Sequence, residues 1–206
     1  MRKLPSIAAA LCALSLGLPA HAQEDRMTLQ NGIEVRPDDS AKLGMLDADM
    51  GQALRQAFAA GAPEDVASLT RALSGAPRSP EAGLAALKGN WKCQTMKLGD
   101  TTPLTVYGNF NCSFDGKTFQ KTSGSQRTTG EIHIDAGRLI YLGTGYVEGS
   151  KVPAYADLPA DPLNAGGAGQ IWSDVAVVEV VSPNRARMIF ADPALESLIN
   201  VIYLTR

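Results

Sequence analysis

One stretch of the sequence, residues 89–114, constrains the fold most strongly, because it carries two cysteines on two extended runs that a turn joins. It reads GNWKCQTMKLGDTTPLTVYGNFNCSF, and the turn falls in 99–103, which is rich in residues typical of turns. In an antiparallel hairpin the numbers of facing residues sum to a constant. A turn centred between positions 102 and 103 places Cys93 opposite Cys112. The sequence therefore predicts a β-hairpin in which the two cysteines face each other.

Residues 1–22 have the pattern of a secretory signal peptide. A basic pair precedes an apolar run over 7–18, and the small-x-small cleavage motif Ala-His-Ala ends at Ala22. The run is too short to cross a bilayer, and no other stretch approaches the roughly 18 consecutive apolar residues that a span needs. We therefore predict a protein that does not span the membrane and is periplasmic or secreted after cleavage near Ala22.

A structural disulfide is the interpretation we adopt for the cysteine pair. Cys12 lies in the apolar run of the leader, so its removal leaves Cys93 and Cys112, an even number in an oxidising compartment. A zinc site is disfavoured because His133 is the one histidine left, and the Cys-x-x-Cys spacing of redox sites is absent. Facing positions on two strands lie at a spacing that a disulfide bridges, and closing this loop should stabilise the fold by about 3 kcal/mol.

The charge of the chain argues against two classes of partner. The chain has 19 Lys+Arg and 21 Asp+Glu, and loss of the two basic residues of the leader leaves 17 against 21, a net charge of −4. The sequence has no basic stripe, so we predict no nucleic-acid partner and no binding to anionic membrane surfaces. The remaining chain is long enough to form one hydrophobic core.

Two kinds of pattern follow the leader. Residues 23–37 lack any period and predict a flexible arm, whereas 38–88 have apolar residues at helical spacing and predict three helices, each ended by a glycine. From residue 89 on, strand-like runs alternate with short turns, which predicts an antiparallel meander. One connection, 148–168, is long and rich in Pro and Gly. The candidate strands are 90–98, 104–114, 118–122, 131–135, 139–146, 169–172, 175–181, 185–191 and 198–205.

A flat meander of eight or nine strands leaves two exposed edges, and closure into a barrel removes both. We therefore predict an α+β fold in which the helical segment 38–88 caps an antiparallel β-barrel, or a strongly curved sheet, over 89–206, with the two packed as one domain. The hairpin register above also places Trp91 opposite Phe114, as an aromatic pair beside the cysteines.

The first strand resembles the opening of a known class of barrels. Gly89-Asn90-Trp91 is similar to the Gly-x-Trp that begins calycin barrels such as lipocalins, whose tryptophan is covered by a basic residue of the last strand. The resemblance implies a calycin-like barrel in which Arg206 or Lys88 covers Trp91. The lipocalin Thr-Asp-Tyr motif is absent, so the resemblance supports the barrel more than a ligand.

A second resemblance extends over nearly all of the mature chain. After the helical segment the motifs GNWKC, VYGNFNC, KTSGSQRTTG, YLGTG and PALESLINVIYL occur in this order. In this the sequence resembles the bacterial family called domain of unknown function 4893. The resemblance implies an exported protein whose helices and sheet form one unit, and it supplies no catalytic residues to transfer.

The segment around 121–130 is our main candidate for ligand recognition. Lys121, Gln126 and Arg127 stand among Ser, Thr and Gly residues, and such side chains bind an anionic or sugar-like group through charge-assisted hydrogen bonds. The alternative is a polar hairpin turn whose side chains satisfy the local backbone. Tyr107 and Tyr141 line the interior if the barrel is hollow and pack in it if the barrel is filled.

Glu131, His133 and Asp135 alternate along one predicted strand and share a face, as the ligands of a metal or an acid/base group would. The solvent face of a strand has the same pattern, and we favour that interpretation. A catalytic serine in 123–127 is disfavoured because the Gly-x-Ser-x-Gly motif is absent. We predict no catalytic residue, no metal and no cofactor.

Arg185 and Arg187 also alternate along one predicted strand. The pattern is that of a solvent-exposed face, and the same positions also allow a contact with Glu179 across the hairpin that is centred on Pro183.

Three classes of function remain open from the sequence. The first is an exported protein that binds a small or lipid-like ligand in its barrel. The second is a structural or protein-interaction module of the cell envelope, which would need a protein partner. The third is a hydrolase. We favour the first, and expect an enzyme least.

Overall fold

The computed structural model describes residues 27–164 and 169–206, so the predicted signal peptide and the cleavage site near Ala22 lie outside the described residues. Three helices come first, and each begins with a proline and carries acidic residues in its first turn. A proline there has a suitable φ, and acidic side chains interact favourably with the positive end of the helix dipole. The helices are α1 (Pro37–Ala60), α2 (Pro63–Leu73) and α3 (Pro80–Leu87).

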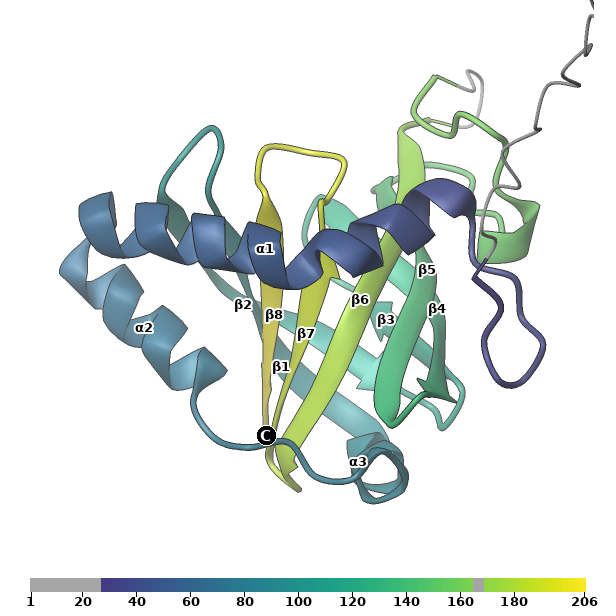
Figure 1. Ribbon diagram of the computed structural model, residues 1–206, viewed down its shortest axis with the longest axis horizontal. Coiled ribbons are helices and arrows are strands. Elements are labelled where there is room, and N and C mark those ends of the chain that lie inside the picture. The colour runs from purple at the N-terminus through teal and green to yellow at the C-terminus, as the bar shows by residue number, and fades with distance from the viewer. Residues whose placement is uncertain (1–26, 165–168) are drawn as a thin grey trace, which may run out of the picture.

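Eight strands follow and form a closed antiparallel barrel, in which each strand pairs with its neighbours in sequence and the last pairs with the first (Figure 1). Closure removes the free edges of the sheet. The predicted α+β fold, with helices before an antiparallel barrel, is confirmed. The strands are β1 (Gly89–Leu98), β2 (Leu104–Phe114), β3 (Thr118–Lys121), β4 (Gln126–Asp135), β5 (Arg138–Val147), β6 (Ile171–Ser182), β7 (Arg185–Ala191) and β8 (Ile199–Thr205).

Two strand boundaries differ from the prediction. The predicted strands 169–172 and 175–181 are one strand, β6, because Ser173 and Asp174 continue the ladder with β5. β4 begins five residues earlier than predicted, at Gln126, because 126–130 also pair with β5. The polar segment that we interpreted as a recognition loop is therefore mostly strand, and its side chains alternate between the inside and the outside of the barrel.

The apolar residues form two clusters on the two sides of the barrel wall. In Figure 1, α1 crosses the outside of β6, β7 and β8, and its buried face packs on apolar residues that point outward from the strands. The inner cluster fills the end of the barrel that α3 covers, with Leu87 of α3 among its members. Its largest side chains are Trp91, Phe114, Phe119, Tyr141, Met188 and Phe190. One end of the barrel is therefore plugged by side chains and a helix.

The β1–β2 hairpin is confirmed, but the predicted register is wrong by two residues. Cys93 faces Phe110, and Cys112 faces Trp91, so Trp91 does not face Phe114. The register follows from the loop at 99–103 and from a bulge in β2, where Tyr107 and Gly108 stand opposite Thr95, rather than from the cysteines. At the cysteines the shift of two keeps the side chains on their predicted faces, whereas between the bulge and the turn the shift is three, and Leu104 and Val106 pack on the outside.

The predicted disulfide nevertheless forms between diagonal positions of this hairpin. The Cα atoms of Cys93 and Cys112 lie 5.9 Å apart, and both side chains belong to the inner cluster. This distance is within the range of natural disulfides. The bridge is compatible with a location outside the cytoplasm.

Arg206, rather than Lys88, covers Trp91. The Arg206 guanidinium lies 3.9 Å from the centroid of a ring of Trp91 and donates to the carbonyl of Lys88 at 2.8 Å. The Trp91 indole donates to the carbonyl of Leu87 at 2.6 Å. A cation–π contact and these hydrogen bonds fasten the last residue of the chain to the junction of α3 and β1.

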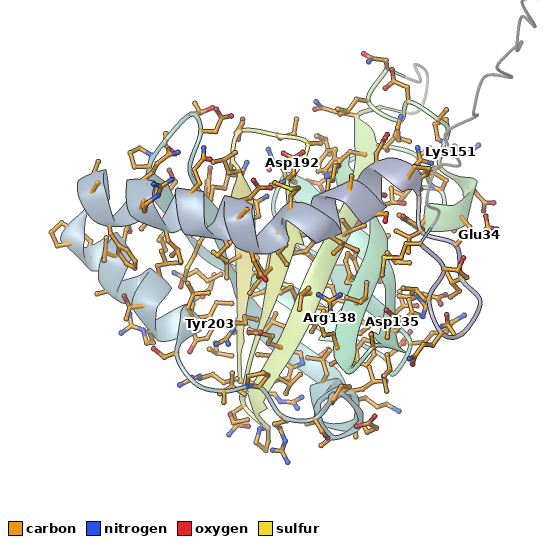
Figure 2. All side chains as sticks on the ribbon, viewed as in Figure 1. Glu34, Asp135, Arg138, Lys151, Asp192 and Tyr203 are labelled. Carbon is orange, nitrogen blue, oxygen red and sulfur yellow. A yellow bond between two sulfur atoms is a disulfide. The ribbon has the colours of Figure 1, made fainter. Side chains whose placement is uncertain are left out.

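The segment before α1 packs on the barrel in its described part, although we predicted a flexible arm over 23–37. Leu29 and Val35 are buried, and Thr28 and Glu34 form a β-bridge. The backbone N–H of Gln30 donates to Asp135 at the end of β4. Figure 2 shows Asp135 on the side of the barrel where the N-terminal segment lies. Short non-helical segments with few apolar residues have no period, so the pattern did not reveal this packing.

The long connection between β5 and β6 contains a short 3-10 helix, Tyr155–Asp157, and is attached to the start of α1. The Tyr155 hydroxyl donates to the buried Asp39 carboxylate at 2.9 Å, and Arg36 donates to the carbonyl of Leu158 at 3.2 Å. Within 27–164 and 169–206, no helix combines the length and the hydropathy that a membrane span requires.

Candidate ligand-binding cavity

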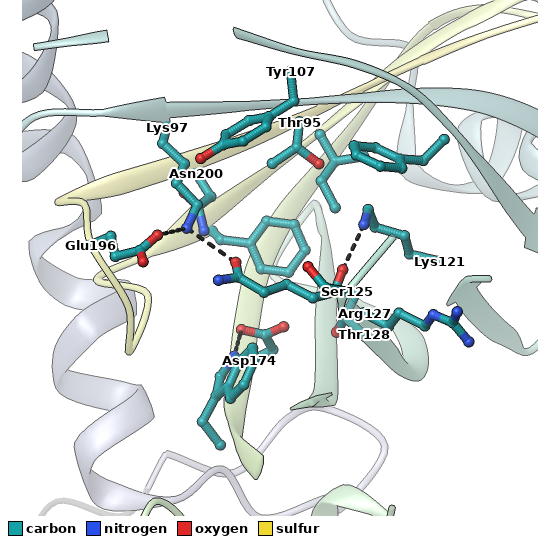
Figure 3. A pocket seen from close by; sticks show the side chains of 15 residues that line it. Thr95, Lys97, Tyr107, Lys121, Ser125, Arg127, Thr128, Asp174, Glu196 and Asn200 are labelled. Carbon is teal, nitrogen blue, oxygen red and sulfur yellow. Dashed lines mark hydrogen bonds and ion pairs between the residues drawn. The ribbon is translucent and has the colours of Figure 1, made fainter. Parts of the chain in front are cut away.

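The end of the barrel opposite α3 holds a cavity of about 300 Å³ that opens to solvent (Figure 3). It adjoins the inner cluster, and polar and charged side chains line it together with aromatic ones. On β1 the inward positions are Trp91, Cys93, Thr95 and Lys97, and only the last two line the cavity. Because side chains alternate along a strand, the inward residues of β1 belong to the inner cluster in its first half and to the cavity wall in its second half.

Lys97 lies deep in this cavity and is paired. Its side chain is 4% exposed, and Nζ donates to Glu196 Oε2 at 2.6 Å and to Gln126 Oε1 at 3.0 Å. The hydrogen bond and the charge of Lys97 lower the pKa of Glu196. Glu196 reaches the pair from the loop before β8 with a left-handed φ of 66°. The positive charge of Lys97 is thus balanced within the protein.

Lys121 is the second buried ammonium, and its environment is different. It is 5% exposed, its Nζ donates to the carbonyls of Ser123 at 3.0 Å and Gln126 at 2.6 Å, and it lies 4.0 Å from the Phe110 ring centroid. Burial, and then the charges of Arg127 and Lys97, lower its pKa to about 8. Among the described residues, no carboxylate forms an ion pair with it.

Asp174, on β6, is a carboxylate on another wall of the same cavity. It is 8% exposed, and its Oδ1 accepts a hydrogen bond from the Trp172 indole at 2.9 Å. Burial raises its pKa to about 6, against the opposing effects of the Thr128 hydroxyl and the Trp172 indole. At neutral pH this carboxyl is mostly ionised.

Two glycines of β5 make room for this arrangement. A Cβ atom at Gly145 would lie 1.9 Å from Trp172 Nε1 and 2.7 Å from Asp174 Oδ2, and one at Gly143 would lie 2.1 Å from the Tyr141 hydroxyl. The alternating glycines of the YLGTG motif therefore leave the inner face of β5 bare, so that an indole and a phenol from neighbouring positions fill it.

The structure brings four of the five predicted ligand-binding residues to the cavity. Lys121, Gln126, Arg127 and Tyr107 line it. Tyr141 lies fully buried below the lining, where its hydroxyl is 2.7 Å from the hydroxyl of Thr128, a residue that does line the cavity. Lys121 and Arg127 also satisfy backbone carbonyls of the turn, as the alternative interpretation expected.

A family comparison covers this whole architecture. The model of the family described as a domain of unknown function, DUF4893, matches residues 32–204, which is most of the chain. The chain belongs to the DUF4893 family. The match begins before α1 and ends in β8, so the helices and the barrel both lie within it. No curated protein and no solved structure matches the chain.

Sequence reasoning did not select three charged or polar residues of this DUF4893 cavity, namely Lys97, Asp174 and Glu196. Lys97 falls on the inward positions of its strand by alternation from Trp91 and Cys93. Asp174 likewise falls on an inward position of an otherwise apolar strand, so the sequence pattern of both residues indicated a place inside the barrel. Glu196 carried none, because its contact with Lys97 joins segments 99 residues apart.

The Glu131, His133 and Asp135 triplet lies on the outside of the DUF4893 barrel, and each member has a different neighbour. Glu131 pairs with Lys117 at 2.9 Å, His133 Nδ1 lies 3.2 Å from the side-chain amide of Asn31, and Asp135 accepts from the backbone of the N-terminal segment. In the part of the chain that the structure describes, no three His, Cys, Asp or Glu side chains are placed to hold a metal ion.

The solvent-face interpretation of Arg187 is wrong. Arg187 is buried, faces Glu179 across the β6–β7 hairpin and pairs with it, which was the alternative prediction. Its guanidinium also donates to carbonyls at the end of α2, among them that of Leu73 at 2.8 Å. Helices cover the outer face of β7 in this chain, so the charged side chain of Arg187 anchors the C-terminal end of α2.

Proposed function

We propose that this protein binds a small organic anion in the open half of its barrel, as an exported binding protein. The observation that carries the proposal is Lys121, a buried ammonium that lines a cavity and forms no ion pair among the described residues. Burying an unpaired charge is unfavourable, and the anionic group of a ligand would supply the missing partner. Arg127 also lines the cavity near Lys121, but its guanidinium pairs with Glu148 at 2.5 Å, so the proposal rests on Lys121.

The other lining residues indicate what the rest of the ligand is like. Phe110, Tyr107, Trp172 and Phe190 contribute aromatic surface, and a buried Thr95 hydroxyl has no hydrogen-bond partner among the described residues. The volume of about 300 Å³ is at the lower end of the range for small-molecule sites. Because the inner cluster fills the barrel below, the cavity suits a compact aromatic or apolar acid better than a long lipid chain.

The proposed location is the periplasm or the exterior of the cell. Two features support it: the signal-peptide pattern of residues 1–22 and the Cys93–Cys112 disulfide. A binding protein in this compartment would meet small organic anions outside the cytoplasm.

Native mass spectrometry of the mature protein purified from the periplasm tests this function. We expect a co-purified small anion on the wild type that Lys121→Met loses and that Lys92→Met, which removes an exposed lysine of β1, retains. Titration with para-methylbenzoate, followed by chemical shifts of Trp172, provides a second measurement. If no bound mass is found and the titration moves no resonance of the cavity, the binding function is wrong, and capture of an envelope protein partner would favour the interaction module instead.

A further inference from the structure

We propose that the ligand is a zwitterion, an organic acid that also carries an ammonium group, and that Asp174 binds that ammonium. This proposal rests on the proposed function of the same cavity and names its ligand class. The carboxylate of Asp174 lines the cavity, is more than nine-tenths buried, and uses Oδ1 to accept a hydrogen bond from the Trp172 indole.

The cations nearest to the cavity do not neutralise Asp174. Lys97 is paired with Glu196 and Gln126, and Lys121 contacts two carbonyls and the Phe110 ring. Lys42 lies on α1, outside the wall, and pairs with Asp39 there at 3.5 Å; its charge lowers the pKa of Asp174, and the charge of Asp39 opposes this effect. Within the described residues Asp174 has no ion pair, so a buried carboxylate faces the cavity with an unmet charge. A ligand ammonium would satisfy it by a charge-assisted hydrogen bond.

Neighbouring side chains hold the carboxylate of Asp174 in a fixed orientation. The indole of Trp172 occupies the space that the absent side chain of Gly145 leaves, and this holds one carboxylate oxygen by a hydrogen bond. The Thr128 hydroxyl lies on the adjacent wall and is itself fixed by the Tyr141 hydroxyl at 2.7 Å. A carboxylate that is oriented by its neighbours loses little freedom when it binds a donor.

The positions of Lys121 and Asp174 define the distance between the carboxylate and the ammonium of the ligand. Lys121 is on β3 and Asp174 on β6, which are separated by three steps around the wall of about 4.8 Å each. Figure 3 shows the two side chains reaching the cavity from different walls. The ligand therefore holds its carboxylate and its ammonium at opposite ends of a short body, as an aromatic ring with two para substituents does.

Isothermal titration calorimetry with three matched probes tests the proposal. The probes are para-aminomethylbenzoate, which has both charges, para-methylbenzoate, which lacks the ammonium, and para-methylbenzylamine, which lacks the carboxylate. On the wild type we expect the zwitterion to bind about tenfold or more tighter than para-methylbenzoate, the gain of one charge-assisted hydrogen bond. In Asp174→Asn we expect this preference to disappear, and we expect para-methylbenzoate, which no longer faces a second carboxylate, to bind at least as tightly as to the wild type. Asp192→Asn, an exposed carboxylate before β8, is the matched control and should keep the preference.

The outcomes separate this proposal from the binding function itself. Equal binding of the zwitterion and para-methylbenzoate to the wild type overturns the zwitterion proposal and leaves the anion site intact. An unchanged preference in Asp174→Asn also overturns it. Binding of para-methylbenzylamine that is sensitive to Asp174→Asn, together with no binding of para-methylbenzoate, keeps the ammonium site and overturns the anion site. Binding of none of the three probes overturns both.

Discussion

Replacement of Lys121 by methionine should change how the stability of the protein depends on pH. The pKa of Lys121 is lowered from its ordinary 10.5 to about 8 in the folded protein, first of all by burial. Between these two pH values the unfolded chain holds a proton on this lysine that the folded protein has already released. The free energy of unfolding of the wild type therefore rises with pH through this window, and a methionine, which does not titrate, removes that rise.

The magnitude follows from the two pKa values. Each pKa unit corresponds to about 1.36 kcal/mol, so the full effect is about 3 kcal/mol. Between about pH 7, where both states are protonated, and about pH 10, where the folded lysine is neutral, roughly 2.5 kcal/mol of it should appear. Other groups, including Tyr141 and Tyr155 with their raised pKa values, titrate in both proteins and cancel in the comparison.

Urea denaturation of the wild type and Lys121→Met at these two pH values measures the effect. We expect the wild type to gain about 2.5 kcal/mol relative to the variant at the higher pH. Lys92→Met controls for the loss of one exposed lysine and should follow the wild type. If the wild type and Lys121→Met show the same pH dependence, Lys121 is not destabilised by burial, and the observation that carries the proposed function loses its force.

Three further changes test the packing. The double substitution Cys93→Ser with Cys112→Ser should lower the free energy of unfolding by about 3 kcal/mol, as should a reductant acting on the wild type, and indifference to both would contradict a stabilising bridge. Arg187→Met should lower the free energy of unfolding by about 3 kcal/mol, because Glu179 and the carbonyls at the end of α2 lose their partner. Thermal melts should show no such loss for Arg138→Met, which removes an exposed arginine. An equal loss in both variants would refute the role of Arg187 in anchoring α2. Gly145→Ala should destabilise by about 1 to 3 kcal/mol and shift the Trp172 indole resonance, whereas Gly108→Ala, with open space at its Cβ, should do neither.

The barrel could be predicted because its signals are local. Short turns such as the one at Asp115, whose Oδ1 accepts the backbone N–H groups of Lys117 and Thr118, predict hairpins between sequence neighbours, and a chain of hairpins closes in only a few ways. The register of β1 against β2 could not be predicted, because no local signal in the sequence determines it. A bulge in β2 and the geometry of the loop set it, and at the cysteines a shift of two residues leaves the inward and outward pattern unchanged, so the sequence pattern does not report it.

The cavity could be predicted only in part. Lys121, Gln126 and Arg127 stood out because they are charged or polar residues within a short polar segment. Ser173 and Asp174 interrupt an apolar run, so the run was predicted as two strands and Asp174 fell in the connection between them. The contact between Lys97 and Glu196 depends on closure of β1 against β8, which brings distant segments together. Pairings made by barrel closure have no local pattern to reveal them.

Because Lys121 and Asp174 are too far apart to pair with each other, the proposed ligand should stabilise the folded protein. Two opposite charges on facing positions of neighbouring strands would pair with each other, as Glu179 and Arg187 do on β6 and β7. Two strands stand between β3 and β6, so the two charges of the cavity stay apart and each remains destabilised by its burial, as the opposite shifts of their pKa values indicate. A ligand that bridges them would relieve both penalties at once, so its binding should raise the stability of the folded protein more than either charge alone could support.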